Sequence, residues 1–267
     1  LKEYMMNKEQ EKRMVEVQSI RNEFESQLKS ITLYIMTENI LSYFSKKKIT
    51  GWNEQANFER DCRSTSNSSL MKKIECDIFM KCDELYTNIS KLFSIDRAKV
   101  RIWRLNIVDN FPLKIISDSD KSNIGAMRRE QKEGKMSIMV QMRTEENSLP
   151  NNLLDINNNL MLYIKFFSSK AKKDHMRYAF SYLLNLDKEN DRGNDRLSDR
   201  LIPVLDKMFG YPAGTKYEAF IERTSDVVKL DLARSITSIK NDATFRNGTV
   251  LIVQLSKESS SLPIPSI

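Results

Sequence analysis

Three cysteines and a single histidine are the residues of this chain best suited to nucleophilic chemistry. They are Cys62, Cys76, Cys82 and His175. A serine or cysteine nucleophile is usually activated by a neighbouring histidine, so such a site would have to use His175. That histidine lies in the charged stretch 172–177, which is typical of a surface turn. We therefore predict an ordinary surface histidine and no catalytic residue.

The cysteines do not match a metal site either. Cys76 alternates with Ile74 and Ile78, so we expect a buried structural thiol there. No CxxC pair is present, and the interval from Cys76 to Cys82 is not a zinc-ligand spacing. We predict no metal and no cofactor. A sparse, odd cysteine count without an apolar signal stretch favours a reducing compartment.

The composition favours a folded protein with diffuse positive charge. The 267 residues are 40% hydrophobic and 30% charged, which is enough apolar material for a core. Lys and Arg number 43 against 36 Asp and Glu, so the formal net charge is +7. The densest basic stretches, at 46–48, 97–104 and 170–177, do not interleave aromatic residues as single-strand binders do. We expect neither nucleic acid as the main partner nor a membrane, since no run of eighteen apolar residues occurs.

The elements that would position a site begin with a long helix. Residues 1–29 contain no Gly or Pro, and charges of both signs interleave. Glu9 and Arg13, like Glu25 and Lys29, stand at the helical i, i+4 spacing. The apolar stripe is sparse, as in a helix that bridges domains. We predict a connector helix.

After this helix the same order of elements occurs twice. Alternating apolar residues predict strands, and apolar side chains at i, i+4 and i+7 predict a helix. Polar loops are expected at 45–70, 117–135 and 187–195. The first copy has strands at 31–36, 74–80, 100–105, 113–116 and 137–142, with a helix that Asp83 caps and that reaches Phe93. The second has strands at 160–166, 176–182, 217–221 and 249–255, with a helix that Ser198 or Asp199 caps and that ends before Gly210.

Two strands, a helix and further strands are the order of a β-grasp fold. The first and last strands would form a parallel central pair, which suits their apolar character. We predict an α+β protein with two tandem ubiquitin-like (β-grasp) domains preceded by a long connector helix. The expected boundaries are 1–29 for the connector helix, 30–149 for the first domain, 150–158 for a linker, 159–256 for the second domain and 257–267 for a linker tail.

This arrangement resembles the region after the catalytic domain in the herpesvirus-associated ubiquitin-specific protease (HAUSP) family. The order of elements over about residues 1–256 carries most of the resemblance. Four local stretches add to it: VRIW at 100–103, LMLYIK at 160–165, residues 200–210 with their early Pro203, and residues 247–254.

The resemblance implies a region of a deubiquitinating cysteine protease that performs no chemistry itself. The Cys and His boxes of that family lie upstream, so we expect this chain to belong to a longer protein. In the family the tandem domains dock substrates and regulators beside the catalytic domain. The resemblance therefore implies protein partners, contact with the protein's own catalytic domain, and a nuclear or cytoplasmic location.

One feature of the family is changed in this sequence. In the family an acidic cluster at the closing turn of the second domain captures Lys-rich peptides. The matching stretch, ATFRNGT at 243–249, has no carboxylate and carries a positive charge. Because a lysine ammonium needs an opposite charge, we predict that this docking mode is weak or absent here, or that the partner differs in charge. The partner-binding candidates are Arg246, Asn247, Gly248 and Thr249.

Two other functions stay open on the sequence alone. The chain could be a tandem ubiquitin-like adaptor of another multidomain scaffold, or a basic module associated with nucleic acid. Trp103 and Tyr163 could serve as exposed binding residues, since aromatic residues are enriched in binding hot spots. For both side chains we favour packing in a core, because large aromatic residues are mostly buried.

Overall fold

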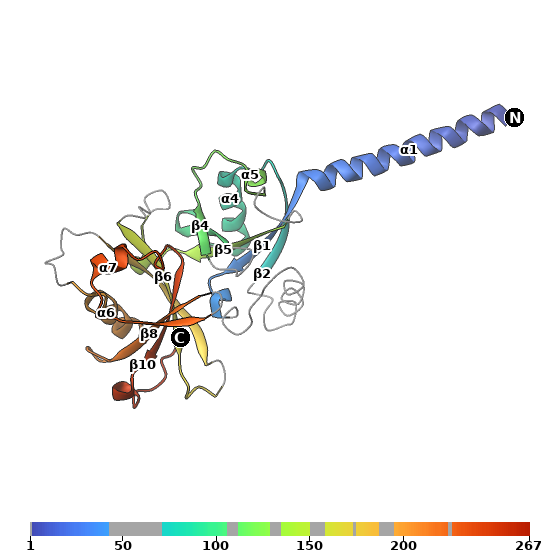
Figure 1. Ribbon diagram of the computed structural model, residues 1–267. Helices are drawn as coiled ribbons and strands as arrows, with labels where there is room; N and C mark the ends of the chain where they lie inside the picture. The colour runs from blue at the N-terminus through green and yellow to red at the C-terminus, as the bar shows by residue number, and fades with distance from the viewer. Residues whose placement is uncertain are drawn as a thin grey trace.

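The protein is an α+β chain built around two five-stranded mixed sheets (Figure 1). The computed structural model describes residues 2–42, 71–105, 112–128, 135–149, 158–172, 175–186, 195–223 and 226–267. Cys62, the predicted loop at 45–70, and most of the loop at 187–195 and of the linker at 150–158 lie outside these ranges.

Five strands between residues 30 and 142 form the first sheet. They are β1 (Ser30–Thr37), β2 (Met71–Asp77), β3 (Val100–Leu105), β4 (Pro112–Ile116) and β5 (Lys135–Met142). Their order across the sheet is β2-β1-β5-β3-β4. Strand β1 is antiparallel to β2 and parallel to β5, so Ile35 lies opposite Lys72 on one side and Ile138 on the other. The accompanying helices are α4 (Cys82–Phe93), α5 (Ile124–Arg128) and the short 3-10 helices η1 (Arg97–Lys99) and η2 (Glu145–Asn147).

The second sheet repeats this topology between residues 159 and 255. Its strands are β6 (Asn159–Phe167), β7 (Met176–Asn185), β8 (Tyr217–Glu222), β9 (Val227–Leu230) and β10 (Thr249–Leu255). Their order is β7-β6-β10-β8-β9, and the central pair β6 and β10 is parallel. The helices are α6 (Leu197–Phe209), α7 (Ile236–Lys240) and η5 (Lys257–Ser259). The predicted parallel pairing of first and last strands is confirmed in both sheets.

Each sheet has its own hydrophobic core on one face. In the first, alternate residues of β1 share one core with the apolar side of α4, and Leu33, Leu85 and Ile89 belong to it. In the second, β6 packs in the same way with Leu201 and Leu205 of α6. Fully burying one such side chain contributes about 1.5–3 kcal/mol, so the two cores hold the helices on their sheets.

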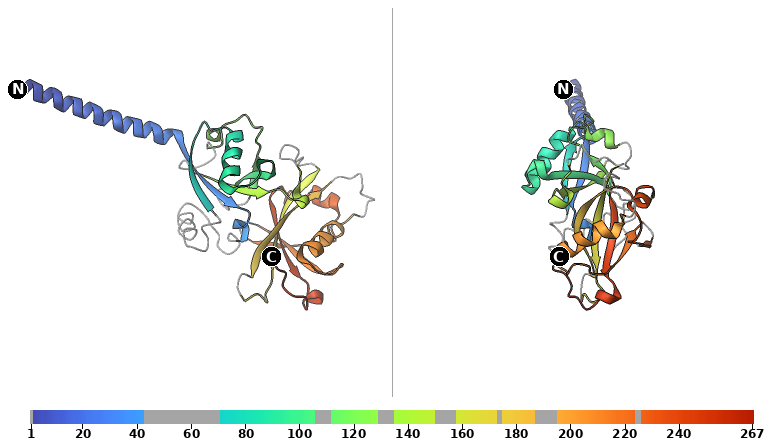
Figure 2. Two further views of the ribbon diagram at one scale, coloured as in Figure 1. Left: turned by 180° about the vertical axis from the view of Figure 1, so that it is seen from behind. Right: turned by 90° about the vertical axis from the view of Figure 1, so that its left-hand side faces the viewer.

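The opposite faces of the two sheets pack against each other and form a third apolar cluster. We call this cluster the sheet interface. Strands β1 and β6 are consequently buried on both faces, which explains the nearly continuous apolar sequence at 31–36 and 160–166. Figures 1 and 2 show the two sheets side by side. The members are Tyr34, Met36, Ile40, Leu41, Trp103, Leu105 and Met139 before residue 150, and Met161, Tyr163, Tyr178 and Val250 after it.

Helix α1 (Lys2–Lys29) extends away from the first sheet (Figure 2). The side chains of residues 8–23 are all exposed, including Met14 and Val17 at 73% and 64%. Ion pairs at i, i+4 spacing join Glu9 to Arg13 at 3.1 Å and Arg21 to Glu25 at 3.2 Å. Such pairs add about 0.2–0.5 kcal/mol each, so local charge pairing supports this helix where packing does not.

Short elements were missed by the sequence patterns. The predicted polar loop at 117–135 contains α5, and the region between β8 and β10 contains β9 and α7. Elements of four or five residues are too short to show a clear period. Pro203 was expected near the first turn of its helix, but it lies in the second turn, because α6 already begins at Leu197. Gly210 ends α6 with a left-handed φ of 68°, as predicted for a residue at that end.

Candidate protein-binding site

The predicted docking turn, residues 243–249, joins α7 to β10 and is held by local hydrogen bonds. The Arg246 backbone N–H donates to Thr249 Oγ1 at 3.0 Å, and the Thr249 hydroxyl donates back to the Arg246 carbonyl at 2.7 Å. Two further bonds tie the turn to β6. The Met161 N–H donates to Asn247 Oδ1 at 2.6 Å, and the Gly248 N–H donates to the Met161 carbonyl at 3.0 Å. The turn is therefore a fixed part of the second sheet.

Gly248 also contacts the first sheet. Its φ is +98°, a conformation that side chains with a Cβ rarely adopt. A Cβ at this position would lie 2.3 Å from the carbonyl oxygen of Pro112 in β4. A glycine is required here because the turn approaches the backbone of the first sheet so closely.

The four predicted partner-binding residues consequently have different surroundings. Gly248 and Thr249 are buried, and Asn247 is half-buried with its side chain bonded to β6. Arg246 has an exposed side chain. The first three contribute structural contacts, and Arg246 is the member of the set that can reach a partner.

Beside this turn lies a cavity of about 270 Å³, which we call the arginine pocket. The pocket lies where the end of β8 meets the start of β10. The antiparallel register of these strands pairs Glu222 with Val250 and so places the two ends side by side. Arg223, at the end of β8, was not singled out from the sequence. No local sequence pattern could have shown that Arg223 and Arg246 line one pocket, since they meet only through the pairing of β8 with β10. The residues that line the pocket include Glu222, Arg223, Thr244, Arg246, Gly248 and Thr249.

Two carboxylates near the arginine pocket, those of Glu222 and Asp242, are already paired. Glu222 forms an ion pair with Lys165, whose side chain is 1% exposed. Burial lowers the pKa of Lys165, and the charge of Glu222 opposes that shift. Asp242 forms an ion pair with Arg234 at 2.8 Å. Hydrogen bonds from Thr244 first, and then from Arg234, lower the pKa of Asp242 to about 2, so this carboxylate stays ionised and engaged. The exposed charge that remains at the turn is positive.

A polar network crosses the sheet interface. Gln141 Oε1 accepts hydrogen bonds from Trp103 Nε1 at 2.8 Å and from Arg101 Nη1 at 3.1 Å. Arg101 is fully buried, and its Nη2 donates to the Asn147 carbonyl at 3.0 Å. The Asn147 side chain then donates to the Ser181 hydroxyl of β7. Burial lowers the pKa of Arg101 to about 10, which leaves the guanidinium charged at neutral pH.

Glu38 lies beside the sheet interface, where it bonds Tyr178. Its Oε2 accepts a hydrogen bond from the hydroxyl of Tyr178, and its Oε1 is buried with no hydrogen-bond partner among the described residues. Burial raises the pKa of Glu38 to about 7. The hydroxyl of Tyr178, the side chain of Gln141 and the charge of Arg101 act in the opposite direction. This carboxyl is protonated more readily than an ordinary glutamate.

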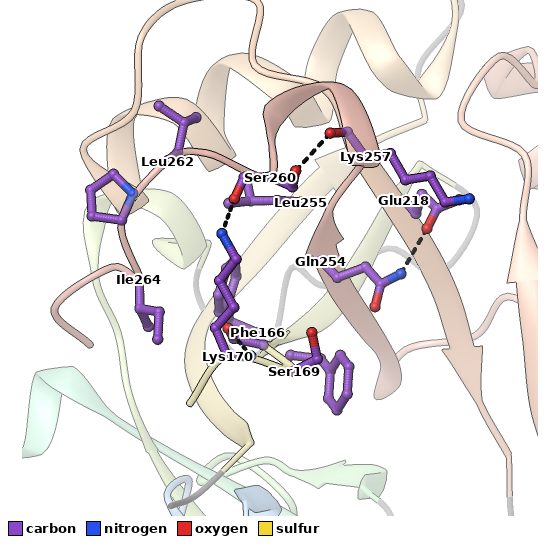
Figure 3. Close-up of a pocket in the computed structure, with 13 residues that line it drawn as sticks. Phe166, Ser169, Lys170, Glu218, Gln254, Leu255, Lys257, Ser260, Leu262 and Ile264 are labelled. Atoms are coloured by element: carbon purple, nitrogen blue, oxygen red, sulfur yellow. Dashed lines mark hydrogen bonds between the residues drawn. The ribbon is translucent and has the colours of Figure 1, made fainter. Parts of the chain in front are cut away.

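The C-terminal residues, predicted as a linker tail, lie against the second sheet (Figure 3). The Tyr211 hydroxyl donates to the Pro263 carbonyl at 2.6 Å, and the Lys170 ammonium donates to the Ser260 carbonyl. Leu262 packs against the second core. A cavity of about 260 Å³ lies between this tail and the ends of β6 and β10, lined by both apolar and polar side chains.

The thiols within the described residues are buried and unreactive in character. Cys76 and Cys82 are free thiols. Burial raises the pKa of Cys76 to about 11 and also raises the pKa of Cys82, which disfavours the thiolate. His175 is exposed, as predicted, with its Nδ1 3.1 Å from the Ser168 carbonyl oxygen.

The described ranges contain no group of His, Cys, Asp and Glu residues placed to hold a metal ion. Within the same ranges, no helix has both the length and the apolar character that crossing a bilayer requires. Three cations of the predicted basic stretches are engaged by internal contacts. Arg101 is buried, Arg97 bonds Asp83, and Lys170 bonds the tail. Comparisons with protein-family models and with curated proteins find no match for this chain.

Proposed function

We propose that the chain consists of two tandem β-grasp domains of the ubiquitin-like type, preceded by a connector helix. The observation that carries this proposal is the repeated strand order, β2-β1-β5-β3-β4 and β7-β6-β10-β8-β9. In each copy the first and last strands form a parallel central pair, and a long helix packs on one face. The exposed helix α1 is consistent with a connector.

The function that follows is a non-catalytic protein-binding and scaffold region of a deubiquitinating cysteine protease of the HAUSP type. The buried thiols with raised pKa values support a region without its own chemistry. The stretches that resemble the family occupy matching elements: 100–103 lies in β3, 160–165 in β6, 200–209 in α6 and 249–254 in β10. The partners would be substrates or regulators of the protease and its own catalytic domain, in the nucleus or cytoplasm.

Capture of Lys-rich peptides at the closing turn is weak or absent in this proposal. The carboxylates nearest the turn, Glu222 and Asp242, are already paired with Lys165 and Arg234. The exposed charged side chain of the turn is Arg246. An approaching lysine would meet a like charge, and the carboxylates of Glu222 and Asp242 are already engaged by other cations.

Two alternatives remain for comparison. A tandem ubiquitin-like adaptor of another scaffold would use the same fold without a protease upstream. A nucleic-acid-associated module would need an open basic surface, and the engagement of Arg97, Arg101 and Lys170 in internal contacts disfavours it. A salt-sensitive gel shift with RNA or DNA would support that second alternative.

The proposal is tested with the full-length protein that contains this chain. We expect it to hydrolyse ubiquitin–rhodamine in a reaction that thiol alkylation abolishes, while residues 1–267 alone show no hydrolysis. The absence of hydrolysis by the full-length protein would refute the deubiquitinase assignment and favour the adaptor.

A further inference from the structure

The arginine pocket contains two guanidinium groups that have no ion-pair partner among the described residues. Arg223 follows β8 and Arg246 lies in the turn before β10, and both side chains are exposed. The ion pairs nearby use Lys165 with Glu222 and Arg234 with Asp242, so neither pocket arginine is neutralised by them. With Glu222 offset by Lys165, the pocket carries an excess of positive charge.

Both arginines are attached to well-fixed backbone. The Arg223 N–H donates to the Asp226 carbonyl at 2.9 Å, and the Arg246 N–H donates to Thr249 Oγ1 at 3.0 Å. The turn that carries Arg246 is further held by Met161 of β6 and by the close approach of Gly248 to Pro112. The backbone that carries the two cations is therefore already ordered, so binding loses no entropy in ordering it.

We propose that the arginine pocket binds a carboxylate side chain of an acidic peptide segment in a protein partner. A guanidinium matches a carboxylate with two parallel hydrogen bonds, and two guanidinium groups can enclose one carboxylate or receive neighbouring ones. This inference rests on the proposed protein-binding function and names the chemistry of the partner.

A peptide fits the pocket better than a nucleic acid. The cavity of about 270 Å³ is slightly smaller than typical small-molecule pockets, a size suited to a side chain. Its described lining contains no aromatic ring on which a base could stack, and single-stranded nucleic acids depend on such stacking.

The test measures binding of short fluorescein-labelled peptides to residues 1–267 by fluorescence anisotropy. The probes are a peptide of alternating Glu and Ser, a peptide of alternating Lys and Ser, and a single-stranded oligonucleotide of similar length. We expect binding of the Glu peptide to weaken at least tenfold in the double variant Arg223→Gln, Arg246→Gln. The matched control is Lys216→Gln, an exposed cation at the other end of β8, which should leave the affinity within twofold.

Equal loss of affinity in the Lys216→Gln control would overturn the proposal, because it would indicate attraction to net charge alone. Preference for the Lys peptide or for the oligonucleotide would also overturn it. A Glu peptide that fails to bind, although the full-length protein hydrolyses ubiquitin–rhodamine, would refute the acidic partner. That result would not affect the proposed deubiquitinase function. Specific binding of the Glu peptide by a protein whose full-length form does not hydrolyse ubiquitin–rhodamine would support the acidic partner and refute the deubiquitinase assignment.

Discussion

The indole ring of Trp103 in β3 meets the phenol ring of Tyr163 in β6 edge to face, with ring centroids 5.8 Å apart and ring planes at 73°. Both side chains are fully buried, which confirms that they are packed and not exposed binding residues. Their contact lies between the two sheets and not inside either core. Because both rings are buried between the sheets, they join the two sheets and are not accessible to a binding partner.

The hydroxyl of Tyr163 gives the first prediction. It is buried with no hydrogen-bond partner among the described residues, so its desolvation is not compensated. Tyr163→Phe should unfold in urea with a stability equal to or above that of the unchanged protein. Tyr163→Ala should lose about 3–5 kcal/mol, since it leaves a large cavity.

Tyr86→Phe is the matched control, because the Tyr86 hydroxyl donates to the Ile116 carbonyl at 2.6 Å. Its removal should cost about 1–2 kcal/mol. A loss at Tyr163→Phe as large as that at Tyr86→Phe would show that the Tyr163 hydroxyl has a partner.

Gly248 gives the second prediction, on the contact between turn and first sheet. Gly248→Ala should cost at least about 2 kcal/mol, because both the positive φ and the approach to Pro112 oppose a Cβ. Gly210→Ala is the control that separates the cost of the positive φ from the cost of the close approach to Pro112. Gly210 also has a positive φ, but a methyl group on its Cα would meet open space, so this change should cost only about 1 kcal/mol. Equal losses in chemical denaturation would mean that the contact with Pro112 is unimportant.

Glu38 gives a prediction on pH. Its pKa is raised to about 7 in the folded protein, against 4.5 as the ordinary value, so the folded state binds more protons between these pH values. Stability from this group is therefore fully present below about pH 4.5 and is lost as the pH rises to 7. The difference amounts to roughly 3 kcal/mol.

Glu38→Gln removes this titration while keeping the shape of the side chain. Urea unfolding of both proteins at pH 5 and pH 8 should show the unchanged protein losing stability relative to the variant at the higher pH. Parallel stabilities at the two pH values would contradict a raised pKa at this position.

A Lys-rich peptide should bind residues 1–267 weakly or not at all. The reason is the exposed Arg246 and the prior pairing of Glu222 and Asp242. Isothermal titration calorimetry checks this directly. Micromolar binding that disappears when the 243–249 turn is altered would refute the prediction.

Much of the fold could be predicted because the central strands have strong patterns. The apolar runs at 31–36 and 160–166 and the helical spacing of Leu85, Ile89 and Leu92 are local signals of elements that are indeed present. The short elements α5, β9 and α7 were missed because four or five residues do not establish a period.

The site could be predicted only in part. The sequence identified Arg246 and the loss of acidic residues around it, but Arg223 joins the pocket through the pairing of β8 with β10. The role of Gly248 depends on its approach to Pro112, more than a hundred residues earlier in the chain. The burial of Arg101 in the sheet interface likewise depends on packing between the sheets, and its sequence neighbourhood looked like an exposed basic stretch.

The proposed scaffold role is tested most sharply by identifying the cysteine that reacts with a ubiquitin probe. The full-length protein is treated with ubiquitin that carries a thiol-reactive group at its C-terminus, and the modified cysteine is located by mass spectrometry. We expect an adduct on a cysteine outside residues 1–267 and none on Cys62, Cys76 or Cys82. An adduct on one of these three cysteines, or no adduct on the protein at all, would contradict a non-catalytic scaffold region of a deubiquitinase.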